Sequence, residues 1–206
     1  MQRRRGLVLQ LLFVASLSGV LAACAAFPQH EVRPDHRPDV ERDSLGTLYV
    51  DLEDYQGRPG RATPDGAAYN EVFGIVRQSL HDIGWFHTLS FEDRDRAQAT
   101  HELHIAVYAQ TGQTLPIVSA VFSYFSFFIL PTMSRTHFIV EAEAIDPQSG
   151  RVLARSKNHD AIHSYAGILM APALIAGKTP NRALNTTLDA QIKAAVIDLE
   201  QQGAWL

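Results

Sequence analysis

The sequence predicts an α+β fold, a two-layer sandwich in which a four-stranded mixed sheet carries two helices on one face. Three observations support this prediction. Four segments alternate apolar with polar residues, which is the period of a strand with one buried face. Two longer segments repeat apolar residues every three or four positions, as amphipathic helices do. The segments occur in the order β-α-β-β-β-α, so sheet and helices would pack as two layers around one core.

The first half of this fold contains a strand, a helix and a second strand. Residues 48–52 alternate apolar and polar side chains, as a half-buried strand does. Thr63, which is followed by proline, has the pattern of a helix N-cap with proline at the first helical position. The apolar stripe of this helix covers residues 69–83, and Gly84 is a helix stop. Residues 103–109 alternate again and predict the second strand.

The second half contains a hairpin and the last helix. Residues 138–144 alternate and predict the third strand. The sequence Asp-Pro-Gln-Ser-Gly at 146–150 predicts a tight turn, because proline fixes φ and glycine permits positive φ. Residues 152–163 predict the fourth strand, which would pair with the third. Thr179, again followed by proline, predicts the start of the last helix, whose apolar stripe covers residues 184–199.

The first 23 residues have the layout of a secretory signal peptide. Three consecutive arginines, Arg3 to Arg5, form a positive n-region, and an apolar run covers residues 7–20. This run is too short to be a comfortable membrane span. It is followed at residues 21–24 by Leu-Ala-Ala-Cys, which holds the one cysteine of the sequence.

Residues 21–24 resemble the lipobox of bacterial lipoproteins, in which an apolar residue and two small residues precede an invariant cysteine. The resemblance implies that residues 1–23 are a cleaved lipoprotein signal peptide. It also implies that Cys24 receives a diacylglycerol and an N-acyl chain such as palmitate, so that the membrane is a partner of the protein. Several acyl chains on one residue anchor a protein far more firmly than a single chain. Because Ala25 and not Asp follows the cysteine, the resemblance favours the outer membrane, on its periplasmic face.

Cleavage before Cys24 changes the charge of the chain. The removed segment holds three Arg and no acid, so 183 residues remain and the net charge falls from −4 to −7. An acidic chain of this kind argues against nucleic acid as a partner. Residues 24–44 contain the lipidated cysteine and a stretch rich in proline and charge, which predicts a disordered tether. Residues 45–206 would then form a single periplasmic domain.

The order of elements predicted for residues 45–203 resembles small α/β domains found in bacterial envelope lipoproteins. Such domains occur in the curli-secretion lipoproteins, in the lipoprotein activators of penicillin-binding proteins and in the N-terminal domain of the Tol translocation protein. The resemblance lies in the order of elements and implies an envelope protein with this type of fold.

Two apolar insertions interrupt the predicted domain, at residues 115–131 and 165–177. Residues 117–130 carry no charge and five aromatic side chains. As a helix they would span about 21 Å, which is less than the roughly 30 Å hydrocarbon core of a bilayer. Pro172 would break a helix in the second insertion. Because the third and fourth strands form a hairpin, both insertions would lie at the end opposite its turn.

Three interpretations of these insertions remain open. They complete the core, they bind a protein partner or another copy of the chain, or they dip into the bilayer beside the lipid anchor. Together they contain more apolar surface than a soluble monomer usually leaves exposed. The contact residues predicted in the first insertion are Phe122, Tyr124, Phe125, Phe127 and Phe128. Those predicted in the second are Ile168, Leu169 and Leu174.

The hairpin also has a predicted register. If residues 148–150 form its loop, opposed residues have numbers that sum to about 298. This register pairs Glu141 with Lys157 and Glu143 with Arg155, and opposite charges in such positions stabilise a sheet.

The same register predicts a candidate metal site of three histidines. His159 and His163 would lie diagonal to His137 on one face of the sheet, at a spacing of roughly 7–8 Å that one ion could bridge. A register shift of one residue would place these imidazoles on opposite faces. The alternative is an exposed polar sheet face with incidental histidines.

The sequence contains no nucleophile elbow, phosphate-binding loop or dinucleotide-binding glycine motif. We therefore expect neither an enzyme nor a bound cofactor. The prediction is a lipid-anchored periplasmic protein that works by binding, as an accessory factor in outer-membrane or cell-wall assembly. Two alternatives remain. One is a homo-oligomeric membrane-associated structure or pore, and the other is a metal-binding or enzymatic domain that uses the histidine face.

Overall fold

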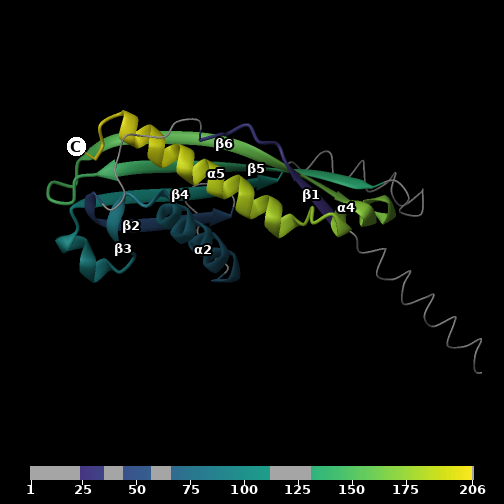
Figure 1. Cartoon of the computed structure of the whole chain (residues 1–206), viewed down its shortest axis with the longest axis horizontal. Coiled ribbons are helices and arrows are strands. Elements are labelled where there is room, and N and C mark those ends of the chain that lie inside the picture. Colours follow the sequence, from purple (N-terminus) through teal and green to yellow (C-terminus); the bar gives the residue numbers. More distant parts are fainter. Residues whose placement is uncertain (1–23, 35–43, 57–65, 112–130, 206) are drawn as a thin grey trace, which may run out of the picture. The chain divides into compact units, whose positions relative to one another are not determined.

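The computed structural model describes residues 24–34, 44–56, 66–111 and 131–205 of the chain (Figure 1). The chain divides into two compact units. Unit 1 consists of Met1–Pro28, Thr111–Thr136 and Ile162–Leu184, and unit 2 consists of Gln29–Gln110, His137–Ala161 and Asn185–Leu206. Three strands and one helix contribute residues to both units, and each unit is described below by itself.

The described residues contain one mixed sheet of six strands. They are β1 (Cys24–Pro28), β2 (Leu45–Gln56), β3 (Phe86–Ser90), β4 (His101–Thr111), β5 (Thr132–Ile145) and β6 (Val152–Ala166). The strand order in the sheet is β1-β6-β5-β4-β2-β3. β1 is antiparallel to β6, whereas β2 is parallel to both β3 and β4. The predicted α+β class with a mixed sheet is confirmed, and the predicted number of four strands is wrong.

The two unpredicted strands are short, and their sequences lack alternation. β1 begins with Cys-Ala-Ala, whose small side chains give no apolar period, although Ala25 and Ala26 are fully buried. β3 has only its end residues, Phe86 and Ser90, buried. Both strands are specified by pairing with distant segments, which local patterning does not show.

In the part of the chain that the structure describes, two long helices accompany the sheet. α2 (Gly66–Ile83) ends before Gly84, whose φ of 68° fits the helix stop that the sequence predicts. α5 (Pro180–Gln201) begins as predicted, because the backbone N–H of Arg182 donates to Thr179 Oγ1 at 3.3 Å. The Thr63 cap predicted for α2 lies outside the described residues. Within the described ranges there are also three short helical segments, η1 (Asp93–Gln98), η2 (Ile168–Met170) and α4 (Ala171–Ile175).

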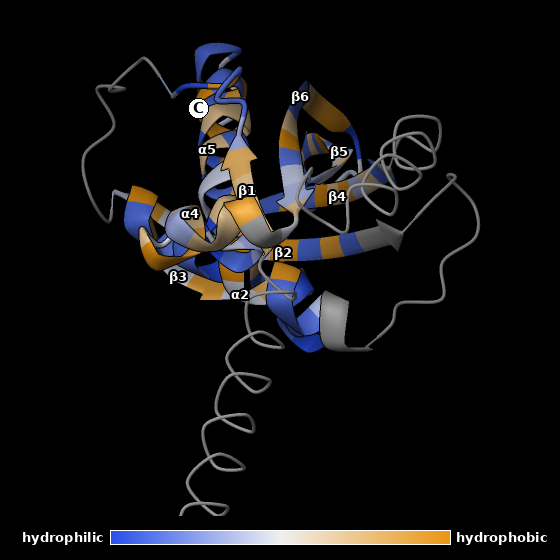
Figure 2. Ribbon diagram, turned by 90° about the vertical axis from the view of Figure 1, so that its right-hand side faces the viewer, coloured by the Kyte–Doolittle hydropathy of each residue, from blue (hydrophilic) through white to orange (hydrophobic). Residues whose placement is uncertain are grey.

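In unit 2, α2 and α5 lie on one face of the sheet (Figure 1). Alternate residues of the strands point toward the helices and are buried, and the hydropathy colours alternate along β2 accordingly (Figure 2). The buried strand residues are Leu48, Val50, Leu103, Ile105, Val107, Val140, Ala142 and Ala144. The helices contribute Val76, Leu80, Leu188, Ile192, Val196 and Leu199. The predicted apolar face and its cover of two helices are therefore confirmed.

The hairpin of β5 and β6 has the predicted register. Lys157 Nζ lies 2.6 Å from Glu141 Oε1, and Arg155 Nε lies 2.9 Å from Glu143 Oε1. Gly150 in the turn has a φ of 68°, which glycine adopts without strain.

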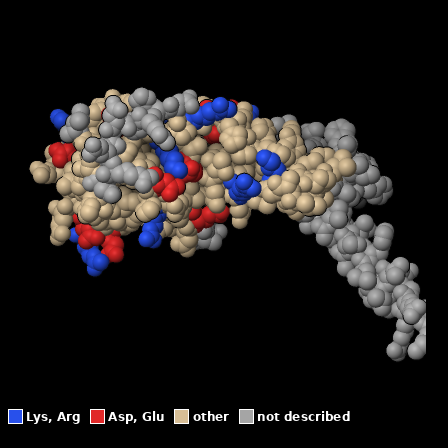
Figure 3. Space-filling model, in the orientation of Figure 1, with Lys and Arg blue, Asp and Glu red and all other residues tan. Residues whose placement is uncertain are grey.

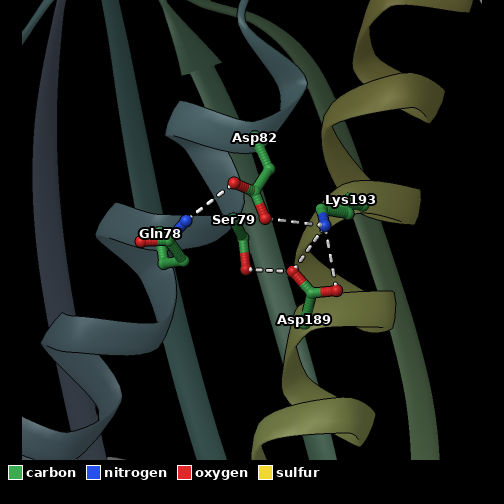
Figure 4. Close-up of polar contacts among 5 residues, drawn as sticks. All are labelled: Gln78, Ser79, Asp82, Asp189 and Lys193. Atoms are coloured by element: carbon green, nitrogen blue, oxygen red, sulfur yellow. Dashed lines mark hydrogen bonds and ion pairs between the residues drawn. The ribbon is translucent and has the colours of Figure 1, made fainter.

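A partly buried polar cluster joins α2 and α5 (Figure 4). Ser79 Oγ donates to Asp189 Oδ1 at 2.7 Å, and Lys193 Nζ lies 2.8 Å from the same oxygen. Lys193 also reaches Asp82 Oδ2 at 3.4 Å, and Gln78 donates to the other oxygen of Asp82. Since every member has a partner within the cluster, we interpret it as a structural clasp between the two helices.

A half-buried histidine lies between two aromatic rings in unit 2. The His101 ring lies 5.9 Å from the Phe86 ring and 5.8 Å from the Trp205 ring. Burial lowers the pKa of His101 below its usual range, because an imidazolium would lose its hydration there. The neutral imidazole of His101 is thus favoured at this half-buried position.

Candidate functional site

Cys24, the predicted lipidation residue, is the first residue of β1 in unit 1. It is half-buried and pairs with Ala166 of β6. The next two residues, Ala25 and Ala26, are 0% and 1% exposed. The prediction of a disordered tether from residue 24 is therefore wrong at its start, because residues 24–28 form a strand. The segment 35–43 of the predicted tether lies outside the described residues.

Further bonds hold β1 within unit 1. The Ala26 N–H donates to the carbonyl oxygen of Lys178 at 2.9 Å. The Phe27 ring meets the Tyr165 ring edge-on, with 5.7 Å between centroids. α4 packs against β1, and the two lie side by side in both ribbon views (Figures 1 and 2). The residue predicted to carry the acyl chains is thus fixed beside α4.

The second predicted insertion, residues 165–177, begins as the end of β6 and continues as η2 and α4. Its contact residues Leu169 and Leu174 are 54% and 37% exposed, and the neighbouring Ile175 is 88% exposed. The side chain of Ile168 lies outside the described part of the structure. Pro172 occupies the first turn of α4 and does not break a helix, because proline lacks only an N–H that the first turn leaves unpaired.

The first predicted insertion, residues 115–131, lies outside the described residues except for its last position. Its five predicted contact residues, Phe122, Tyr124, Phe125, Phe127 and Phe128, are within that undescribed part. Among the residues that the structure describes, no helix is long and apolar enough to cross a membrane.

The sheet face of unit 2 that points away from α2 and α5 is here called the open face. Alternation places on it Asp51, Glu53, His104, Tyr108, Glu141, Glu143, Arg155 and Lys157. His104 Nε2 lies 3.3 Å from Glu53 Oε2, and the Tyr108 hydroxyl donates to Glu141 Oε2 at 3.4 Å. Burial and the charge of Glu141 raise the pKa of Tyr108, so its phenol stays a neutral donor. The open face therefore presents a charged, hydrogen-bonded surface.

One end of the open face holds an ion pair between a buried glutamate and a half-exposed arginine, which sequence reasoning missed. Glu102 is 1% exposed, and Arg96 of η1 contacts both of its carboxylate oxygens, with Nε at 3.0 Å and Nη2 at 2.6 Å. The Arg96 guanidinium also lies 5.8 Å from the centre of the Tyr49 ring. Burial, together with its hydrogen bond to Asp93, raises the pKa of Tyr49. The signal in the sequence is an acid at a strand position that follows a charged loop.

The three histidines of the candidate metal site belong to different units. His137 and His159 lie in unit 2, whereas His163 lies in unit 1 and pairs with Phe27. His159 Nε2 lies 3.6 Å from Glu31 Oε2. Within the described residues, no group of three or more His, Cys, Asp or Glu side chains could hold a metal ion. The metal hypothesis therefore gains no support from the geometry.

Comparison with known proteins gave matches to solved structures alone. No family model matches the sequence, and no curated protein matches it. The PelC dodecamer from Paraburkholderia phytofirmans matches with a TM-score of 0.40 and 12% identity, over 83% of this chain and 95% of that chain. Protein XCC0632 from Xanthomonas campestris matches with a TM-score of 0.44 and 14% identity, over 85% and 96%.

A protein named as a lipoprotein is also among the matched structures. GNA1162 from Neisseria meningitidis has a TM-score of 0.34 and 14% identity, over 65% of this chain and 96% of that chain. TM-scores below 0.5 and identities of 12% to 14% are too low to assign a family or a function to this chain. Its class therefore depends on its own residues, which define an α+β protein with a mixed sheet.

Proposed function

We propose that this chain is a lipid-anchored accessory protein of the bacterial envelope, which works by binding and not by catalysis. Acylated Cys24 would hold it at the periplasmic face of the outer membrane, where it would serve outer-membrane or cell-wall assembly. The observation that carries the proposal is the position of Cys24. The residue at which a lipobox would be cleaved is also the first residue of strand β1, so processing there would leave the described fold intact.

The open face of unit 2 is our candidate surface for a protein partner. α2 and α5 cover the opposite face, so the open face is where a further layer can be added. Unit 2 is strongly acidic. Of the 15 Lys and Arg residues that follow residue 23, 12 belong to unit 2 together with all 22 Asp and Glu residues, which gives a net charge of −10. Such a surface favours a partner with a basic binding site.

Site-specific cross-linking tests this partner surface. Tyr108 on the open face would be replaced by the photoreactive analogue p-benzoylphenylalanine, and Tyr69 on α2 would be replaced in the same way as a control. We expect one discrete cross-linked product from position 108 in intact cells and none from position 69. The double variant Glu141→Gln/Glu143→Gln should weaken that product several-fold, because it removes two charges from the open face.

The matched control for the charge effect is Asp198→Asn/Glu200→Gln, which removes two acids from α5. The proposal predicts no change in the cross-linked product for this variant. Equal products from positions 108 and 69, or equal losses in the two double variants, would contradict binding through the open face.

A further inference from the structure

We infer that unit 1 is a docking surface for an anionic phospholipid bilayer, formed by α4, its flanking turns and the start of α5 around Cys24. This inference deepens the proposed function, since it assigns to unit 1 the way in which the protein lies on the membrane. It rests on three independent features of the described residues, which are charge, exposed apolar side chains and the position of the anchor.

The charge of unit 1 is opposite to that of the remainder of the chain. Beyond residue 23, unit 1 carries Arg135, Lys178 and Arg182, and its sequence contains no Asp or Glu. Its net charge is therefore +3, in a mature chain of net charge −7. Lys178 and Arg182 are exposed. The surface over α4 and the start of α5 in Figure 3 shows blue among tan and no red.

The exposed apolar side chains of unit 1 lie next to these cations. Leu174 and Ile175 are at the end of α4, and Lys178 follows three residues later. Leu169, Leu174 and Ile175 are 54%, 37% and 88% exposed within seven residues, and exposed apolar side chains gathered in this way mark an interaction surface. Apolar residues that enter the interface beside basic residues at the headgroups are the common pattern of interfacial membrane binding. Tyr165 adds an amphipathic ring of the type that is enriched at membrane interfaces.

The anchor is fixed to this surface. Ala26, which is bonded to the Lys178 carbonyl, lies two residues from Cys24, a distance of about 7 Å in a strand. Acyl chains on Cys24 would therefore enter the bilayer close to α4 and Lys178, with no slack between the lipid and the fold. A single bilayer surface can then receive the acyl chains and the apolar side chains together, while the phosphates contact the cations.

Vesicle binding tests the inference without lipidation. All described elements lie within residues 24–205, so the chain from residue 24 with the change Cys24→Ser retains them. We expect it to bind vesicles that contain phosphatidylglycerol, and to bind vesicles of phosphatidylcholine alone at least about tenfold more weakly. Binding should also weaken as the salt concentration rises, because exposed charges are screened.

Two variants separate charge from apolar contact. Lys178→Glu/Arg182→Glu should lower the affinity for phosphatidylglycerol vesicles at least about tenfold. The matched control Arg77→Glu/Arg151→Glu makes the same change of net charge at exposed arginines of unit 2 and should leave the affinity unchanged. Ile175→Ser should weaken binding while the thermal unfolding midpoint stays the same, because the side chain is already in water.

Absence of vesicle binding, equal affinity for both lipids, or equal losses in the two charge-reversal variants would overturn the inference. Formation of an oligomer that depends on Ile175 would likewise overturn it, since a second copy would then cover α4. None of these results bears on acylation of Cys24, which is measured separately on the processed protein, so failure of this inference and failure of the proposed function are distinguishable.

Discussion

Replacement of Arg96 by methionine is expected to lower the free energy of unfolding by about 2 kcal/mol. Arg96 holds both carboxylate oxygens of Glu102, which is 1% exposed. Removing the partner of a buried charge costs roughly 3–5 kcal/mol when both groups are buried. The Arg96 side chain is 52% exposed, and solvent screening reduces that figure. Methionine replaces the aliphatic stem of the arginine but leaves the carboxylate without its two donors.

Denaturant unfolding of a small set of variants checks this prediction. Arg94→Met removes a neighbouring arginine of η1 whose carboxylate partners are exposed, so we expect a change within about 0.5 kcal/mol. Glu102→Gln/Arg96→Met should be more stable than the sum of the two single changes allows, since neither charge is then left alone. Equal effects of the Arg96 and Arg94 changes would show that the buried pair does not stabilise unit 2.

Replacement of Leu188 by alanine is expected to cost about 3 kcal/mol of unfolding free energy. Leu188 is 0% exposed and faces the sheet near the middle of α5. Substitutions of buried leucine by alanine cost roughly 3–5 kcal/mol, because they lose transfer free energy and leave a cavity. Because α5, together with α2, covers the apolar face of unit 2, we expect this substitution to destabilise the whole of that unit.

Ile175 provides the matched control for this prediction. It removes a similar volume of side chain when changed to alanine, but it is 88% exposed in unit 1. We expect Ile175→Ala to change the unfolding free energy by no more than about 0.5 kcal/mol. A large loss of stability on changing Ile175, or a small one on changing Leu188, would contradict the burial that the structure assigns to these two residues.

The contrast between Leu188 and Ile175 also shows what the sequence could predict. Both residues lie in apolar segments. Leu188, however, belongs to a long series of apolar residues at helical spacing, and such a series reliably predicts which side of a helix is buried. The four alternating strands, the turn at 146–150 and the pairing of Glu141 with Lys157 were predictable for the same reason. Each depends on a local period or on a turn that fixes the register.

What could not be predicted depends on contacts between distant segments. β1 is recognisable only beside β6, since Ala25 and Ala26 have no period of their own. The prolines of residues 24–44 were read as signs of disorder, although Pro28 simply ends the strand. The burial of Glu102 could not be predicted either, because it depends on the contact with Arg96 that η1 provides.

The candidate site was likewise predictable only in part. Cys24 and its neighbouring small residues form a local motif, so the proposed anchor was visible in the sequence. The positive charge of unit 1 was not, because it depends on which segments belong to that unit: together they hold Arg135, Lys178 and Arg182 beyond residue 23, and no Asp or Glu. An overall net charge of −4 concealed a cationic unit and a strongly acidic one.

Mass spectrometry of the protein purified from the membranes of cells that express the full sequence tests the central claim most directly. Our account predicts an N-terminal peptide that begins with Cys24 and carries a diacylglyceryl group on Sγ together with an N-acyl chain. Peptides from residues 1–23 should be absent from the processed protein. A mature protein that retains those residues, or one whose Cys24 thiol is unmodified, would contradict the lipid anchor and with it the proposed function.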